Sequence, residues 1–117
     1  MSKDSVLSNK LKFDQENNHK KGFCSFDGQT AMQNYKAFGA VWDLIEEVKP
    51  NTITEIGTAA GGFTRFLKAA VDDLNFSCKV ISYDVNKVEK RKLLLDLGID
   101  YREEDCFGKN SESNLFK

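Results

Sequence analysis

The sequence predicts an α/β protein built on a Rossmann-like parallel sheet with helices on both faces, apparently truncated after its third strand. Short β-branched segments alternate with amphipathic segments between residues 52 and 102, the pattern of parallel strands joined by right-handed helical crossovers. A glycine-rich loop follows the first of these strands. Nothing after Tyr101 has the pattern of a further strand, so half of a doubly wound sheet is expected.

The first 28 residues are rich in Lys, Asn, Ser and Asp and show neither helical nor strand periodicity. They are therefore expected to form a polar N-terminal arm, residues 1–28, without regular structure. Phe23 and Phe26 are the candidate anchors of this arm. The expected domain then covers residues 29–107, and a polar tail covers residues 108–117.

The first helix is predicted between a turn at Asp27 and Gly28 and the single proline, Pro50, with Thr30 as its cap. A proline disfavours helical geometry in the residue before it and so ends the helix. Apolar side chains in this segment recur every three or four residues, which is the spacing of one helix face: Met32, Tyr35, Phe38, Trp42, Ile45 and Val48.

Strands and helices alternate after Pro50. The strands are recognised by β-branched residues in short runs, and the helix of residues 62–74 has the strongest helical periodicity in the chain. Gly98 is expected to end the last helix in a left-handed cap. In order, the sequence predicts a strand over 52–56, a helix over 62–74, a strand over 79–84, a helix over 86–97 and a strand over 99–102.

A chain of 117 residues with eighteen acidic and seventeen basic side chains has the size of one small domain and a formal charge of -1. Without a net positive field, nucleic acid is not an expected partner. The longest stretch of low charge, residues 53–64, is far shorter than the roughly 20 apolar residues of a membrane span. The polar start has no signal-peptide core, so we expect a cytoplasmic chain with no membrane partner.

Cys24, Cys78, Cys106 and the single histidine, His19, are widely spaced along the chain. The sequence therefore predicts no metal site and no disulfide. A catalytic cysteine needs a nearby base, and His19 lies in the polar arm. No catalytic residue is assigned.

Candidate ligand contacts follow the ends of the three predicted strands, because open α/β sheets bind ligands beyond their carboxyl ends. The first is the loop of residues 57–62, whose three glycines permit a tight turn. The second is Asp84, placed to accept hydrogen bonds from both hydroxyls of a ribose. The third is Asp105 with Cys106, where a carboxylate and a backbone amide could bind the edge of an adenine.

The glycine loop departs from two nucleotide-binding fingerprints. Phe63 stands where the phosphate-binding loop has its lysine. Ala59 occupies the second glycine position of the dinucleotide fingerprint and would crowd a pyrophosphate. Glu55, just before the loop, disfavours a phosphate there. It suits a ligand that carries a cationic amino group and no phosphate, and S-adenosylmethionine has that chemistry.

The run E-I-G-T-A-A-G-G-F-T, followed by S-Y-D-V and E-D-C-F, resembles class I S-adenosylmethionine-dependent methyltransferases. The preceding W-D-L-I and V-K-P are similar to the cephalosporin-hydroxylase-like and sugar O-methyltransferase branch of that family. The resemblance covers residues 35–107. It implies S-adenosylmethionine as cofactor and a small molecule or a sugar hydroxyl as methyl acceptor.

The resemblance also implies the contacts of each part of the cofactor. The loop of residues 57–62 would contact the methionine part, Asp84 the ribose, and Asp105 with Cys106 the adenine. The fourth strand of the family, which usually carries the acceptor-side acids, has no counterpart here, so the chain alone is expected to be inactive or to depend on a partner. The candidate cofactor-binding residues are Glu55, Gly57, Thr58, Ala59, Ala60, Gly61, Gly62, Phe63, Asp84, Val85, Asp105 and Cys106.

Plainer roles compete with these assignments. The loop glycines could serve only the close packing of a helix on a strand, Asp84 could cap the following helix, and Asp105 could be an exposed acid. The basic cluster of residues 87–92 is expected to be a solvated helix face, because acids lie beside it. The aromatic stripe of residues 35–42 is expected to be core or interface.

Two further functions remain open from the sequence. A strand order of 3-2-1 would leave residues 53–56 at an edge of the sheet, and an apolar edge is a template for association. The chain would then be an interaction module that forms a homodimer, through this strand or through the aromatic face of residues 35–48, or pairs with a partner chain that completes the sheet. The other candidate is an NAD-binding Rossmann half that uses Asp84 for the ribose.

Overall fold

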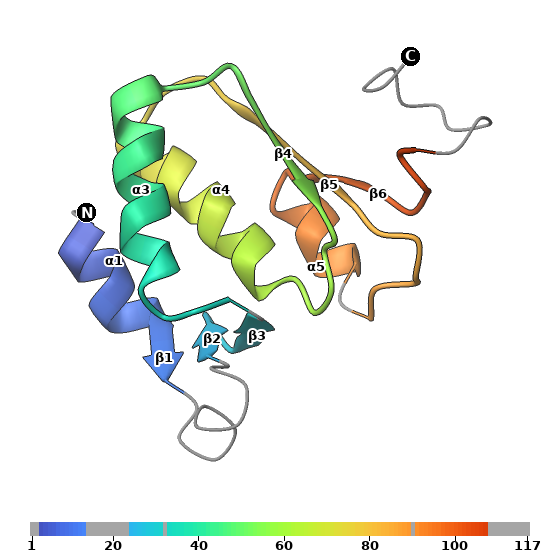
Figure 1. The fold of residues 1–117 in the computed structure, drawn as a ribbon, viewed down its shortest axis with the longest axis horizontal. Coiled ribbons are helices and arrows are strands. Elements are labelled where there is room, and N and C mark those ends of the chain that lie inside the picture. The colour runs from blue at the N-terminus through green and yellow to red at the C-terminus, as the bar shows by residue number, and fades with distance from the viewer. Residues whose placement is uncertain (1–2, 14–23, 32, 90, 108–117) are drawn as a thin grey trace.

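The computed structural model describes residues 3–13, 24–31, 33–89 and 91–107. Within these ranges the chain forms a parallel sheet in the order β4-β5-β6 and a small antiparallel sheet in the order β1-β2-β3 (Figure 1). The prediction of an α/β protein with a three-stranded parallel sheet is confirmed. In chain order the elements are α1 (Lys3–Lys10), β1 (Leu11–Phe13), β2 (Cys24–Phe26), β3 (Gln29–Ala31), α3 (Ala37–Val48), β4 (Thr52–Ile56), α4 (Gly62–Leu74), β5 (Lys79–Tyr83), α5 (Arg91–Asp96) and β6 (Asp100–Arg102).

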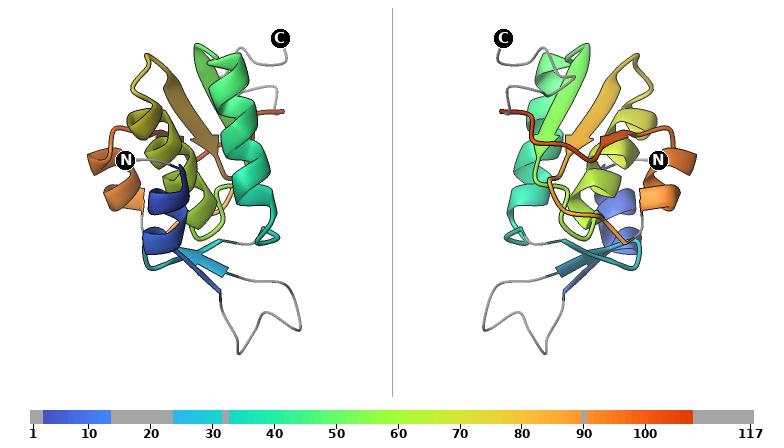
Figure 2. Two further views of the ribbon diagram at one scale, coloured as in Figure 1. Left: turned by 90° about the vertical axis from the view of Figure 1, so that its left-hand side faces the viewer. Right: turned by 90° about the vertical axis from the view of Figure 1, so that its right-hand side faces the viewer.

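The helices that pack on the parallel sheet cover one of its faces. Val80 and Ser82 of β5 are buried toward the helices, whereas Lys79 on the other face pairs with Asp100 of β6, with 3.1 Å between Nζ and Oδ2. The right-hand view of Figure 2 shows the parallel sheet in front of α3 and α4. The expectation of helices on both faces is wrong for the described part, because right-handed crossovers that advance in one direction leave every helix on the same side.

Helix α3 ends where the proline rule predicts. Lys49 takes a left-handed conformation with φ 45°, and its N–H bonds the carbonyl of Ile45 at 2.8 Å. Pro50 then leads into β4. The start of this helix differs from the prediction, because Thr30 lies in β3 instead of capping a helix, and α3 begins only at Ala37.

The N-terminal residues are not an arm without regular structure. Helix α1 packs beside α3 and α4, and β1, β2 and β3 form an antiparallel sheet. Val6, Leu11 and Cys24 are buried in the same core as the helices of the parallel sheet. The expectation failed because strands of three residues are too short to show periodicity, and the apolar residues of this region are scattered among polar ones. Phe26 is buried as predicted, while Phe23 and the tail of residues 108–117 lie outside the described residues.

The predicted turn at Asp27 and Gly28 is confirmed and joins β2 to β3. Both residues have positive φ, 51° and 85°, as a two-residue type I′ hairpin turn requires. Arg65 of α4 clamps this turn, with Nη1 donating to the Asp27 carbonyl at 2.8 Å and Nη2 to the Asp27 carboxylate at 2.5 Å. The antiparallel sheet is thereby fixed against α4.

The final helix is shorter than predicted. Helix α5 begins at Arg91, so the chain between β5 and α5 is not helical from residue 86. Val88 lies in this segment and is buried in the core, while Tyr101 accepts a hydrogen bond from its N–H at 3.4 Å. The prediction of a helix from residue 86 is therefore wrong at its start, because tertiary contacts of Val88 with the core and with Tyr101 hold this segment in a non-helical conformation.

The main core lies between α3, α4, the antiparallel sheet and the helix side of β5. Three fully buried aromatic rings form its centre, with centroid separations of 4.9 Å between Phe38 and Phe66 and 5.6 Å between Phe26 and Phe66. Trp42 is also fully buried, and Tyr35 is half-exposed. The prediction that this stripe is core is therefore confirmed for Phe38 and Trp42. No helix in the described ranges is both long enough and apolar enough to cross a bilayer.

Two glycines give a matched test of this packing. A Cβ on Gly62 would lie 2.5 Å from the backbone oxygens of Gln29 and Thr30, whereas a Cβ on Gly39 of α3 meets nothing within 4 Å. We expect Gly62→Ala to destabilise the protein by about 1–3 kcal/mol through overpacking. We expect Gly39→Ala to stabilise it by about 0.5–1 kcal/mol through helix propensity. Urea unfolding of both variants measures the difference, and equal free energies of unfolding would contradict the close approach of α4 to β3.

Candidate functional site

The glycine loop between β4 and α4 is fixed by backbone hydrogen bonds to the end of β5. The N–H groups of Gly57 and Thr58 both donate to the carbonyl of Tyr83, at 2.7 and 3.1 Å. Gly57 and Gly61 have φ values of 96° and 91°, which glycine adopts without strain. Ala59 has φ 51°, a left-handed conformation that is costly for a residue with a Cβ. The loop is thus a specific turn and not merely a flexible connection.

Asp84 joins this loop to the segment after β5. One carboxylate oxygen accepts the N–H of Ala59 at 2.8 Å, and the other accepts the N–H of Asn86 at 2.9 Å. The alternative role of Asp84 as a helix cap is wrong, because the next helix begins at Arg91. Each carboxylate oxygen can accept more than one hydrogen bond, so Asp84 can hold the loop and still accept hydroxyl groups of a ligand.

A chain of buried hydroxyl groups ties the loop to the sheet and to α4. Ser82 donates to Oε1 of Glu55 at 2.6 Å, Thr64 donates to the same oxygen, and the hydroxyls of Thr58 and Ser82 lie 2.6 Å apart. Since the Ser82 proton points to Glu55, Thr58 is the donor in the last pair. Burial raises the pKa of Glu55, the two hydroxyl donors oppose that rise, and the negative charge of Asp84 adds to it.

A small cavity opens at the carboxyl ends of the parallel strands; we call it the strand-end cavity. Its volume is about 190 Å³, below the roughly 300–1,000 Å³ of pockets that enclose a whole drug-sized ligand, so it suits one ring system of a larger molecule. The charged side chains among its described lining residues are all acidic. The lining residues are Ile56, Gly57, Tyr83, Asp84, Val85, Glu104, Asp105, Cys106 and Phe107.

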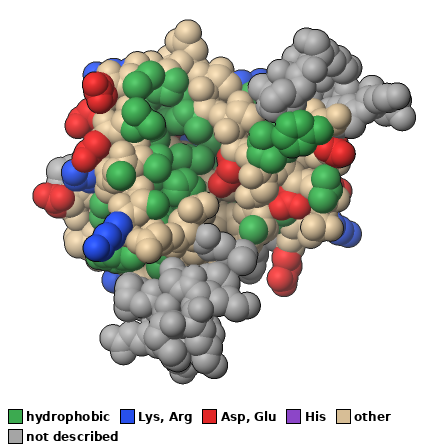
Figure 3. Space-filling model, in the orientation of Figure 1, with side chains coloured by type: hydrophobic (Ala, Val, Ile, Leu, Met, Phe, Trp, Pro, Cys, Tyr) green, Lys and Arg blue, Asp and Glu red, His purple; other side chains and the backbone are tan. Residues whose placement is uncertain are grey.

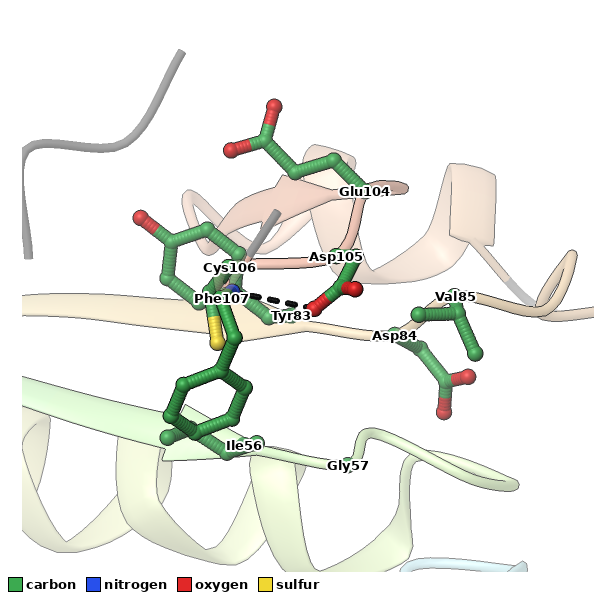
Figure 4. A pocket seen from close by; sticks show the side chains of 9 residues that line it. All are labelled: Ile56, Gly57, Tyr83, Asp84, Val85, Glu104, Asp105, Cys106 and Phe107. Atoms are coloured by element: carbon green, nitrogen blue, oxygen red, sulfur yellow. Dashed lines mark hydrogen bonds between the residues drawn. The ribbon is translucent and has the colours of Figure 1, made fainter. Parts of the chain in front are cut away.

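Apolar and acidic groups occupy different parts of the strand-end cavity (Figure 4). The ring of Phe107 lies over Ile56, and the carboxylate of Asp84 points away from that ring. Asp105 accepts the N–H of Phe107 at 2.9 Å, which fixes the turn after β6. A flat apolar ring could therefore bind near Phe107 while a polar substituent reaches Asp84.

A second cavity lies on the other side of the glycine loop; we call it the Gln29 cavity. Its volume is about 360 Å³, and its walls come from the β2–β3 turn, the loop and the segment before α5. Among the described residues that line it, Lys87 is an exposed cation and Glu89 an exposed anion. The lining residues are Gly28, Gln29, Thr30, Ala59, Ala60, Lys87, Val88 and Glu89.

Gln29 is a site residue that the sequence analysis missed. Its side chain is 7% exposed, and its Nε2 donates to the carbonyl of Ala60 at 3.1 Å. This contact fixes the amide orientation, because the opposite orientation would set two acceptors against each other. Oε1 is buried and has no hydrogen-bond partner among the described residues, and a buried acceptor of this kind is satisfied by a donor from a ligand or a water molecule. Nothing in the sequence around Gln29, which follows the turn residues Asp27 and Gly28, indicates that its amide oxygen is buried.

Of the twelve predicted site residues, seven line one of the two cavities and five line neither. Gly57, Asp84, Val85, Asp105 and Cys106 line the strand-end cavity, and Ala59 with Ala60 lines the Gln29 cavity. The other five pack inside the protein and line neither cavity: Glu55, Thr58, Gly61, Gly62 and Phe63. Glu55 in particular is held by hydroxyl groups, and Phe63 lies 5.3 Å from Phe66 between ring centroids.

Comparison with family models, curated proteins and solved structures gave no match. Within the described ranges, no group of three or more His, Cys, Asp or Glu side chains is placed to hold a metal ion. His19 lies outside these ranges. The chemistry of the site therefore has to be inferred from the two cavities and the loop between them.

The raised pKa of Glu55 gives a pH-dependent test of the hydroxyl chain. Because the folded state holds this proton more tightly than the unfolded state, stability falls as pH rises from the ordinary Glu pKa to the folded pKa. Glu55→Gln keeps an oxygen that Ser82 and Thr64 can bond and removes the titration. We expect the variant to be more stable than the wild type at pH 7, by about 1.4 kcal/mol for each unit of the pKa rise.

Urea unfolding of the wild type and Glu55→Gln, repeated from acid to neutral pH, measures this difference. The stability gap should shrink as pH falls below the ordinary Glu pKa of about 4.3. Glu47→Gln, a change of the same type at an exposed position of α3, is the matched control for the loss of one carboxylate. A Glu55 variant that loses stability at pH 7 would contradict a carboxylate held in an unfavourable buried position.

Proposed function

We propose that this chain is the S-adenosylmethionine-binding part of a class I methyltransferase with a Rossmann-like fold, acting on a small molecule or a sugar hydroxyl. The observation that carries the proposal is the position of Asp84. It holds the glycine loop through Ala59, and it shares the strand-end cavity with Asp105 and Cys106. The three strand ends that the sequence singled out thus meet at one site.

The strand-end cavity has the chemistry of an adenosine site. Ile56, Val85 and Phe107 provide apolar surface for the adenine ring. Asp105 and the backbone amide of Cys106 are the candidate partners for its polar edge, and Asp84 is the candidate acceptor for the ribose hydroxyls. A carboxylate that accepts two hydroxyl protons makes charge-assisted hydrogen bonds, which are among the stronger kinds.

The Gln29 cavity fits the amino-acid end of the same cofactor. Oε1 of Gln29 lacks a donor, which an ammonium group supplies, and Lys87 is available for a carboxylate. Ala59 lines this cavity and donates its N–H to Asp84, which lines the strand-end cavity. One extended ligand could therefore contact both cavities across the loop.

Charge favours this cofactor over a dinucleotide. Among the described residues, three carboxylates and no Lys or Arg line the strand-end cavity, so a pyrophosphate beside these residues would meet like charge. S-Adenosylmethionine carries no phosphate and has cationic sulfonium and ammonium groups. When bound, it supplies an electrophilic methyl group. The protein's part is to position the acceptor oxygen behind that methyl group; none of the described residues is assigned as the base that takes the acceptor's proton.

Calorimetric titration with S-adenosylhomocysteine tests the proposal. We expect binding by the wild type and a loss of at least about tenfold in affinity for Asp84→Asn, since a hydrogen bond to a charged group contributes about 1.5–3 kcal/mol. Glu103→Gln removes one negative charge from an exposed residue next to the cavity lining and should bind normally. Far-ultraviolet circular dichroism confirms that each variant is folded.

Two further titrations locate the ligand. Gln29→Met should weaken S-adenosylhomocysteine binding and leave adenosine binding unchanged, because only the former ligand has an amino-acid end. NAD is the competing ligand. If the folded chain binds NAD tightly and does not bind S-adenosylhomocysteine, a dinucleotide-binding function replaces the methyltransferase proposal.

A further inference from the structure

Strand β4 presents a free row of backbone donors and acceptors. In the described residues it pairs with β5 alone. The carbonyl of Asn51 accepts from Lys79, and the N–H of Gly57 donates to Tyr83, so the odd-numbered residues of this segment direct their peptide groups toward β5. Because these groups alternate along a strand, those of Thr52, Thr54 and Ile56 point to the free side.

Within the part of the chain that the structure describes, this edge lacks the usual protection against strand pairing. Exposed edges are commonly blocked by lysines, prolines or bulges, and β4 has the sequence Thr-Ile-Thr-Glu-Ile with continuous register to β5. Its one charged residue, Glu55, is bonded by hydroxyls from α4 and β5. The carboxylate is thus hydrogen-bonded on the helix side of the sheet and does not face an approaching strand.

An apolar groove runs beside the free edge, between α3 and β4. It has a volume of about 290 Å³, and Figure 3 shows hydrophobic side chains gathered over this part of the surface. Leu44 and Val48, each 58% exposed, form its outer wall, and Thr52 and Ile53 of the edge strand form its floor. None of the described residues that line it is charged; they are Val41, Leu44, Ile45, Val48, Pro50, Thr52, Ile53 and Leu67.

We infer that the occupant of this surface is a second copy of the same chain, bound by antiparallel pairing of the two β4 strands. A twofold axis at Thr54 sets Thr54 against its own copy and Thr52 against Ile56. All three residues have peptide groups directed outward, so every pair exchanges two backbone hydrogen bonds. The two parallel sheets become one six-stranded sheet, and each α3 covers the groove of the other copy.

The β4 edge and the apolar groove beside it are complementary to the same surface on a second copy of the chain. A partner must present an uncharged strand with apolar side chains beside it, because a charge placed in the groove would lose its hydration without gaining a counter-ion. The β4 edge and the exposed Leu44 and Val48 have these properties. Isologous twofold contacts are also the commonest arrangement in soluble oligomers. The inference does not depend on the cofactor.

Light scattering after size exclusion, from low-micromolar to millimolar concentration, tests the dimer. The expected mass rises toward twice the 13.2 kDa of one chain. Leu44→Lys should raise the dimer dissociation constant by about tenfold or more, because it places a charge in the buried groove. Leu95→Lys changes a Leu of similar exposure, 53%, on α5 and should leave dimerisation unaltered.

A second pair of variants tests the strand itself. Thr54→Pro removes the central N–H donor and should abolish dimerisation, whereas Thr54→Val keeps the N–H and should retain it. Fluorescence of Trp42, which is buried and the only Trp in the chain, reports whether each variant is folded. A folded wild type that stays at 13.2 kDa at millimolar concentration would overturn the inference. Equal weakening by Leu44→Lys and Leu95→Lys, or dimerisation by folded Thr54→Pro, would also overturn it.

Discussion

The partly buried carboxyl group of Glu55 joins the elements that form the site. Through Ser82 it is joined to β5, through Thr64 to α4, and through the Ser82 hydroxyl to Thr58 of the glycine loop. A buried polar group must be satisfied to be tolerated, so this chain fixes the loop relative to two other elements. The loop conformation, including the strained Ala59, is consequently set before any ligand binds.

The small antiparallel sheet has a similar role on the other side of α4. A parallel sheet of three short strands buries little apolar surface, and here the N-terminal residues contribute Val6, Leu11 and Phe26 to the shared core. The close approach of Gly62 to β3 and the Arg65–Asp27 clamp fix that sheet at the amino end of α4. The same contacts bring Gln29 to the glycine loop, so one side of the site is built by residues that precede the parallel sheet.

The sequence predicted the helices and strands that have a long or regular pattern of residue types, and it did not predict the others. Both β4 and α4 have the predicted bounds, because β4 is a short β-branched run between Pro50 and Gly57 and α4 has a regular helical period. The antiparallel sheet was missed, since it is held by tertiary contacts and not by local pattern. Asp84, Asp105 and Cys106 were predicted to lie together, because strand ends of one sheet share an edge. Gln29 could not be found, because its unpaired oxygen exists only once the loop is packed against it.

The uncovered face of the sheet is only partly protected by its own side chains. Arg102 spans β5 and β6, bonding Asp100 at 2.9 Å and the Tyr83 hydroxyl at 2.9 Å, whereas the β4 side of this face ends in Ile56, which is 53% exposed. Ile56 also lines the strand-end cavity. A ligand in that cavity and a strand at the free edge would therefore contact the same residue. By linkage, any effect of the ligand on strand pairing must be matched by an equal effect of pairing on ligand affinity.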